Sequence, residues 1–114
     1  LVGSEMCIRD RMNILKFSAQ WCMPCKMMKP IFKEVSKDEK YKNIDFIEID
    51  IEDENLIKKF NITPNDLCTK YSIRNIPTLI IVDDDLNEVG KMVGGADKNK
   101  ITNFIDTTLN QKGE

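Results

Sequence analysis

The sequence predicts one α/β domain in which a small mixed sheet of four strands is flanked by helices. Short apolar segments follow the period of two that strands show, and other segments follow the helical period. At 114 residues the chain can bury one hydrophobic core but not two. Its strand–helix–strand opening predicts a parallel pair with a right-handed crossover, and a later hairpin adds antiparallel strands.

The first strand and the first helix are predicted in the first third of the chain. Residues 12–18 (M-N-I-L-K-F-S) predict the strand. From about residue 22 to about residue 37, apolar residues recur at helical spacing and predict a helix with one apolar face. Pro30 lies inside this helix, where it removes one backbone hydrogen bond and should introduce a kink. The residues of the apolar face are Met27, Met28, Ile31, Phe32 and Val35.

The middle of the chain predicts a second strand and two short helices. Residues 47–51 alternate isoleucine with acidic residues, as a strand does. The helices are predicted at about residues 53–60 and 64–71. Thr63 is the expected N-cap of the second helix, with Pro64 at its first position.

One pattern occurs twice in this region. Segments 56–62 and 67–73 both match L-x-x-K-aromatic-polar-I. A local duplication and a chance match in a lysine-rich stretch both explain the similarity. Two copies do not indicate a solenoid, which needs at least three repeats.

The last part of the chain predicts a hairpin and a helix. Residues 78–82 form an apolar strand, residues 83–87 turn the chain, and residues 88–93 form the partner strand. Two glycines end the hairpin. A final amphipathic helix begins near Asp97. Its apolar face is expected to bury Ile101, Phe104, Ile105 and Leu109.

Charge and composition argue against two kinds of partner. The formal net charge is −2 and nothing supplies a basic face for phosphates, so we expect no nucleic-acid partner. No apolar run approaches the roughly 18 residues of a membrane span, so we expect no membrane insertion. The acidic runs at 50–54 and 83–85 are interpreted as solvated turns. We expect a monomer.

Residues 1–11 fit the rest of the chain poorly. They lack the continuous apolar core and the small-residue cleavage site of a secretory signal, and they show no helical or strand period. We interpret them as a non-native or disordered leader and expect the folded domain to span residues 12–111. Without a signal peptide, the expected compartment is the reducing cytoplasm.

The chain has four cysteines and no histidine. Cys22 and Cys25 form a C-x-x-C pair, whereas Cys7 lies in the leader and Cys68 stands alone. The missing signal argues against a secreted disulfide framework. A structural zinc site needs four ligands, typically two such pairs or one pair with histidines, and the chain has neither. We expect no metal and no cofactor beyond a redox-active disulfide between Cys22 and Cys25.

The position of this pair favours thiol–disulfide exchange. Cys22 is predicted at the N-terminus of a helix, where unpaired backbone N–H groups and the helix dipole favour the thiolate. Cys25 lies one helical turn further on the same side. Cys22 can therefore attack a substrate disulfide, after which Cys25 attacks Cys22 and releases the reduced substrate. Trp21 offers a flat apolar platform for a polypeptide, and Pro24 suits a helix start.

Two motifs in this order resemble those of the thioredoxin family. Residues 17–27 contain W-C-x-P-C-K, and residues 70–78 contain Y-x-I-x-x-I-P-T. Pro30 resembles the kinking proline of the family's helix, and Gly94 resembles the glycine after its last strand. The resemblance covers about residues 12–109. It implies the thioredoxin fold and an enzyme that reduces protein disulfides.

The resemblance also implies the substrate site and the partners. It implies a cis peptide bond before Pro77 and a loop against the cysteine pair, whose backbone pairs with a client like an added strand. It implies disulfide-containing client proteins and thioredoxin reductase or a similar electron donor. A thioredoxin-fold binding adaptor and a disulfide isomerase are the alternatives. The implied substrate-binding residues are Trp21, Met23, Pro24, Ile76, Pro77, Thr78 and Gly94.

Three features depart from the family pattern. The usual first strand and helix are missing if the domain begins at Met12. Lys16 stands where the family has a buried aspartate, and it could either hold the thiolates electrostatically or extend to solvent without a role. The segment 50–71 is longer than expected, and Cys68 within it is interpreted as a packing cysteine.

Overall fold

The computed structural model describes residues 12–113. Residues 1–11 lie outside the described residues. The interpretation of this segment as a leader, and the missing first strand and helix that go with it, therefore stay predictions.

Four strands form one mixed sheet in the order β2-β1-β3-β4. β1 (Asn13–Ser18) is parallel to β2 (Asp45–Asp50) and antiparallel to β3 (Thr78–Val82). β4 (Glu88–Val93) completes the hairpin with β3. The predicted four-stranded mixed sheet is confirmed, although β2 begins earlier than predicted and ends before Ile51.

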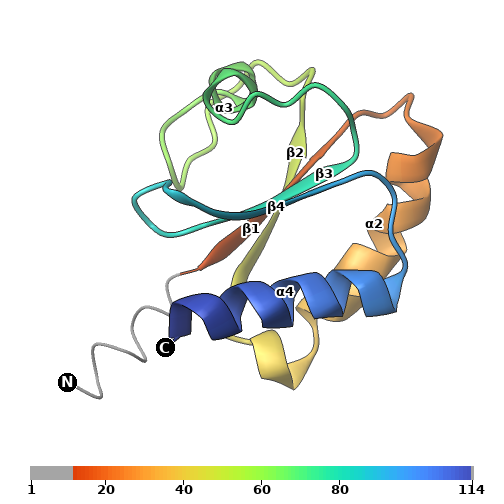
Figure 1. Ribbon diagram of the computed structural model, residues 1–114. Coiled ribbons are helices and arrows are strands. Elements are labelled where there is room, and N and C mark those ends of the chain that lie inside the picture. Colours follow the sequence, from red (N-terminus) through yellow and green to blue (C-terminus); the bar gives the residue numbers. More distant parts are fainter. Residues whose placement is uncertain (1–11, 114) are drawn as a thin grey trace.

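Three helices cover the two faces of this sheet. They are α2 (Met23–Ser36), α3 (Pro64–Lys70) and α4 (Lys98–Gly113), and a short 3-10 turn η1 (Glu39–Tyr41) precedes β2. Figure 1 shows α2 and α4 on one side of the sheet and α3 on the other. Among the described residues, no helix combines the length and the apolar character that a membrane crossing requires.

β1 runs through the centre of the sheet, and all six of its residues are buried. Successive side chains of a strand point to opposite faces, so β1 contributes to two separate cores. The core beneath α2 and α4 contains Ile14, Met28, Phe32, Val35, Leu79, Ile81, Ile101 and Ile105. The core beneath α3 contains Leu15, Phe17, Ile49, Leu67, Tyr71, Ile80 and Val82.

Replacing Leu79 by alanine should lower the free energy of unfolding by about 2–5 kcal/mol, because it leaves a cavity in a packed core. Leu79 is 0% exposed. Leu56→Ala is the matched control, since it removes the same atoms from a side chain that is 55% exposed. Its expected cost is below about 0.5 kcal/mol. Chemical denaturation measures both variants, and equal losses would contradict the placement of β3 in the core.

Residues 53–60 do not form the predicted helix. They form turns, and an isolated antiparallel bridge joins Ile57 and Ile62. The carboxylates of Asp50 and Asp53 each accept a hydrogen bond from the backbone N–H two residues on, at 2.9 Å. Such local bonds compete with a helix, and short helices are marginal in water without tertiary packing. These two acidic residues therefore shape turns.

The two copies of the repeated pattern differ in secondary structure but end alike. Only the second copy is helical, as α3. At the shared polar position, Asn61 has a φ of 55° and Ser72 has a φ of 53°. The isoleucines that follow, Ile62 and Ile73, both pack against the core beneath α3. The common pattern thus corresponds to a left-handed turn with an apolar anchor.

The predicted apolar face of α2 is wrong at Met27, whose side chain is 67% exposed. An α-helix turns by about 100° per residue, so Met27 and Met28 cannot both point to the centre of the same face. Ile31 is only half-buried. The buried residues of α2 are Cys25, Met28, Phe32 and Val35.

The apolar face of α4 is narrower than predicted. Ile101 and Ile105 are buried, whereas Phe104 and Leu109 are only half-buried. Thr108 is buried instead, one turn beyond Ile105. The helix therefore covers the sheet with a narrow stripe and leaves the edges of its apolar face partly in water.

Candidate functional site

Cys22 and Cys25 lie where β1 leads into α2. Cys22 is the N-cap of the helix, and the exposed Pro24 follows in its first turn. The Cys25 N–H donates a hydrogen bond to the Cys22 Sγ at 3.3 Å, and the two cysteines form a disulfide. Cys22 is 5% exposed and Cys25 is 2% exposed. A helix N-terminus thus directs a backbone donor at the sulfur of Cys22.

Two loops from the other half of the chain lie beside the pair. The Ile76–Pro77 peptide bond is cis, as the resemblance implies, and the Ile76 carbonyl oxygen lies 3.9 Å from the Cys22 Sγ. The Gly94 N–H donates a hydrogen bond to the Pro77 carbonyl oxygen at 2.8 Å. Gly94 has a φ of 98°, which strongly favours glycine. The structure therefore brings Ile76, Pro77 and Gly94 to one place next to Cys22.

Three large apolar side chains near the pair face solvent. Trp21 is 65% exposed, Met23 is 64% exposed and Met27 is 67% exposed. Thr78 differs from the other predicted substrate-binding residues, because its side chain is buried and its hydroxyl donates to the Asn75 carbonyl oxygen at 2.6 Å. Thr78 therefore stabilises the loop that contains the cis-proline, rather than offering its side chain to a client.

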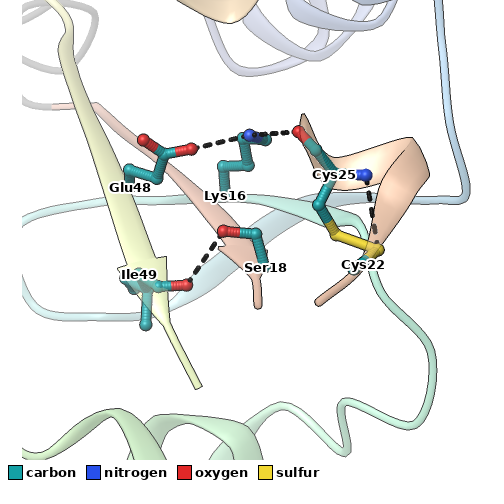
Figure 2. Close-up of polar contacts among 6 residues, drawn as sticks. All are labelled: Lys16, Ser18, Cys22, Cys25, Glu48 and Ile49. Atoms are coloured by element: carbon teal, nitrogen blue, oxygen red, sulfur yellow. Dashed lines mark hydrogen bonds and ion pairs between the residues drawn. A yellow bond between two sulfur atoms is a disulfide. The ribbon is translucent and has the colours of Figure 1, made fainter. Parts of the chain in front are cut away.

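Lys16 is fully buried behind the cysteine pair. Its ammonium group donates to the Cys25 carbonyl oxygen at 3.1 Å and forms an ion pair with Glu48 at 2.7 Å. It also lies 5.9 Å from the centre of the Phe32 ring. Figure 2 shows Lys16 between Glu48 of β2 and the first turn of α2. The alternative that Lys16 extends to solvent is therefore wrong.

Glu48 was not predicted as a site residue. It lies directly opposite Lys16 in the parallel register of β1 and β2. Opposite charges in two strands that are predicted to pair can indicate an ion pair between the strands, but only when the register of the strands is known. The sequence did not provide that register, because the connection between the two strands includes a whole helix.

A pocket lies next to Cys25 and the Lys16–Glu48 ion pair. Cys25 and Glu48 both line it, and so do three further charged side chains, Lys26, Lys29 and Asp50. The pocket therefore connects the region around Cys25 with solvent. Within residues 12–113, no group of three His, Cys, Asp or Glu side chains is placed to hold a metal ion.

Cys68 is not packed against Cys22 and Cys25. It is the free cysteine of the described residues and packs, partly buried, against the core beneath α3. Burial raises the pKa of the Cys68 thiol, because desolvation disfavours the thiolate. A raised pKa makes Cys68 a poor nucleophile near neutral pH.

Iodoacetamide should modify Cys22 before Cys25 and Cys68 in the reduced protein at pH 7. Only Cys22 is placed at the helix N-terminus, and Cys25 is less exposed. Short exposures followed by peptide mapping measure the order of modification. A Cys7→Ser background removes the thiol outside the described residues. Faster modification of Cys25 or Cys68 would contradict the assignment of Cys22 as the attacking thiol.

A C-x-x-C disulfide at the start of a helix, beside a cis-proline loop and against a mixed four-stranded sheet, defines a protein with a redox-active disulfide. The sequence profile of the thioredoxin family matches residues 4–107. The chain belongs to the thioredoxin family.

Relatives and solved structures agree with this assignment. Thioredoxin of Pongo abelii is 32% identical over 102 residues, which cover 90% of this chain and 80% of the relative. Thioredoxin of Buchnera aphidicola is 34% identical over 98 residues, which cover 85% of this chain and 79% of that relative. The structure of Malassezia sympodialis thioredoxin matches with a TM-score of 0.69 at 24% identity, over 88% of this chain and 76% of that one. The predicted thioredoxin fold is confirmed.

Proposed function

We propose that this chain is a protein-disulfide reductase that works through Cys22 and Cys25. The Cys22 thiolate attacks a client disulfide, forms a mixed disulfide and releases one client thiolate. The Cys25 thiolate then attacks the Cys22 sulfur and releases the second client thiolate. Two electrons pass from the cysteine pair to the client, and the pair is left as a disulfide. The observation that carries the proposal is the disulfide between these two residues at the start of α2.

The roles of the two cysteines follow from their surroundings. Cys22 is the N-cap and accepts a hydrogen bond from the Cys25 N–H, so the helix N-terminus stabilises negative charge on its sulfur. Cys25 is the more deeply buried of the two and lies within bonding reach of Cys22. This supports Cys22 as the attacking thiol and Cys25 as the resolving thiol.

The client docks on the exposed surface around Cys22. Trp21, Met23 and Met27 offer flexible and flat apolar area, and methionine side chains adapt to partners of different shape. The backbone of Ile76, next to Cys22, pairs with an extended client segment as an added strand. The space beside Gly94 is open, since no atom lies within 4 Å of where its Cβ would be, so a client backbone can approach there.

The proposed partners and compartment follow from this chemistry. The clients are proteins with accessible disulfides, and thioredoxin reductase or a similar donor returns two electrons to the oxidised pair. The reaction belongs in the cytoplasm, where a reducing donor is maintained. The chain acts as a monomer and binds neither nucleic acid nor membranes in this role.

An insulin-reduction assay tests the proposal. Dithiothreitol supplies electrons, and precipitation of the freed insulin B chain reports catalysis. The reduced protein should accelerate precipitation well beyond dithiothreitol alone, and Cys68→Ser should behave as the wild type. No acceleration by the wild type would contradict the proposal and favour the binding adaptor. Rearrangement of scrambled disulfides without net reduction would favour the isomerase.

A further inference from the structure

A contribution to folding stability does not explain why Lys16 is buried behind Cys25. Its side chain is 0% exposed, and it lies on the same face of β1 as the core residue Ile14. A buried ammonium group is unfavourable unless it is paired and hydrogen-bonded. Even then, apolar side chains of similar volume often stabilise a core as well as a buried ion pair does. The contact between Lys16 and Cys25 points instead to the chemistry of the cysteine pair.

We propose that Lys16 is a positioning residue for Cys25 and that Glu48 holds it in place. The ammonium group fixes the first turn of α2 through the Cys25 carbonyl oxygen. Because the carbonyl and the thiol belong to one residue, the buried charge also stabilises the thiolate that Cys25 must form. This inference rests on the proposed function, since Cys25 acts as a nucleophile only in the second exchange step.

The second exchange step is balanced without any further reagent. The Cys25 thiol gives its proton to solvent in the pocket that Cys25 and Glu48 line. A bond forms between the two cysteine sulfurs, and the bond between Cys22 and the client sulfur breaks. The bonding electron pair leaves with the client thiolate, so the client is reduced and the cysteine pair is oxidised.

We expect the charges around Cys25 to favour a thiolate there. Lys16 is fully buried, so water screens its charge least. The side chain of Glu48 is 36% exposed, which weakens its opposing effect. The other charged groups that face this pocket, all partly or fully exposed, are Asp50 from β2 and Lys26 and Lys29 from α2.

Two substitutions should move the second step in opposite directions. Reduced protein in a Cys7→Ser, Cys68→Ser background, which leaves only Cys22 and Cys25, is mixed with excess 5,5′-dithiobis(2-nitrobenzoate). One thionitrobenzoate is released when Cys22 attacks, and a second is released when Cys25 resolves the mixed disulfide. In Lys16→Met, the midpoint of the pH profile of the second phase should rise by about one unit. The second phase at pH 7 should slow about three- to tenfold, because higher intrinsic nucleophilicity offsets part of the lost thiolate. In Glu48→Gln, the amide oxygen can still accept the hydrogen bond from Lys16, but the opposing negative charge is gone, so the midpoint should fall by about half a unit.

A loss of packing alone would slow the second phase in both variants, so opposite shifts identify a charge effect. Lys29→Met is the matched control, since it removes an exposed lysine from the same pocket and should change neither phase by more than about twofold. Shifts in the same direction, or shifts no larger than those of Lys29→Met, would overturn the inference. If circular dichroism shows that Lys16→Met does not fold, the inference is tested by the midpoint of Glu48→Gln alone. That midpoint should fall by more than any shift seen in Lys29→Met. If the parent protein of this background, with Lys16 and Glu48 intact, releases no second thionitrobenzoate, the result contradicts the proposed function instead.

Discussion

Replacing Cys22 by serine should abolish catalysed disulfide reduction. The rate should fall at least about a hundredfold, to the background set by dithiothreitol, because a serine hydroxyl is not ionised at neutral pH and cannot start the exchange. The exchange of sulfur for oxygen changes the side chain little in size, so the fold should persist. Insulin reduction measures the loss, and circular dichroism verifies the fold.

Cys68→Ser is the matched control for this substitution. Cys68 packs against the core beneath α3 and takes no part in the disulfide. The control should retain wild-type activity within about twofold. A Cys22→Ser variant that kept more than about a tenth of the wild-type rate would show that another thiol carries the chemistry.

Replacing Cys25 by serine should trap the client on the protein. Cys22 keeps its place at the N-terminus of α2, so the first attack should proceed at a rate within about threefold of the wild type. The second attack cannot occur, and the mixed disulfide should accumulate to one client per protein chain. Intact-mass analysis under non-reducing conditions measures it.

The matched control for the trap is Cys22→Ser, which should form no mixed disulfide under the same conditions. Added dithiothreitol should release the client from Cys25→Ser. A trap that forms in Cys22→Ser but not in Cys25→Ser would mean that the roles of the two cysteines are reversed.

The parts of the fold that depend on local patterns were predictable. The apolar run of β3 and the alternation in β2 follow directly from strand periodicity. Thr63 was predicted as an N-cap, and its side chain accepts a hydrogen bond from the Asp66 N–H at 3.2 Å. The C-x-x-C pair could also be placed at a helix start, since this requires only neighbouring residues.

The failures occur where long-range contacts or competing local bonds decide the structure. Residues 53–60 include helix-forming residues, but some of their backbone N–H groups are bonded in other ways. The Asn55 N–H donates to the Asp53 side chain, and Ile57 forms a bridge with Ile62. Met27 fits an apolar spacing, yet it faces solvent at the site. The Lys16–Glu48 pair depends on the register of two strands separated by a helix, which local periodicity does not encode.

The reduction potential of the Cys22–Cys25 pair tests the central claim most directly. The protein is equilibrated with glutathione redox buffers at pH 7, and the oxidised fraction is measured by thiol trapping and mass analysis. For a reductase we expect a potential below about −230 mV, in the range that includes thioredoxin itself at about −270 mV. A potential of about −180 mV or higher, in the range of protein disulfide isomerase, would contradict the account.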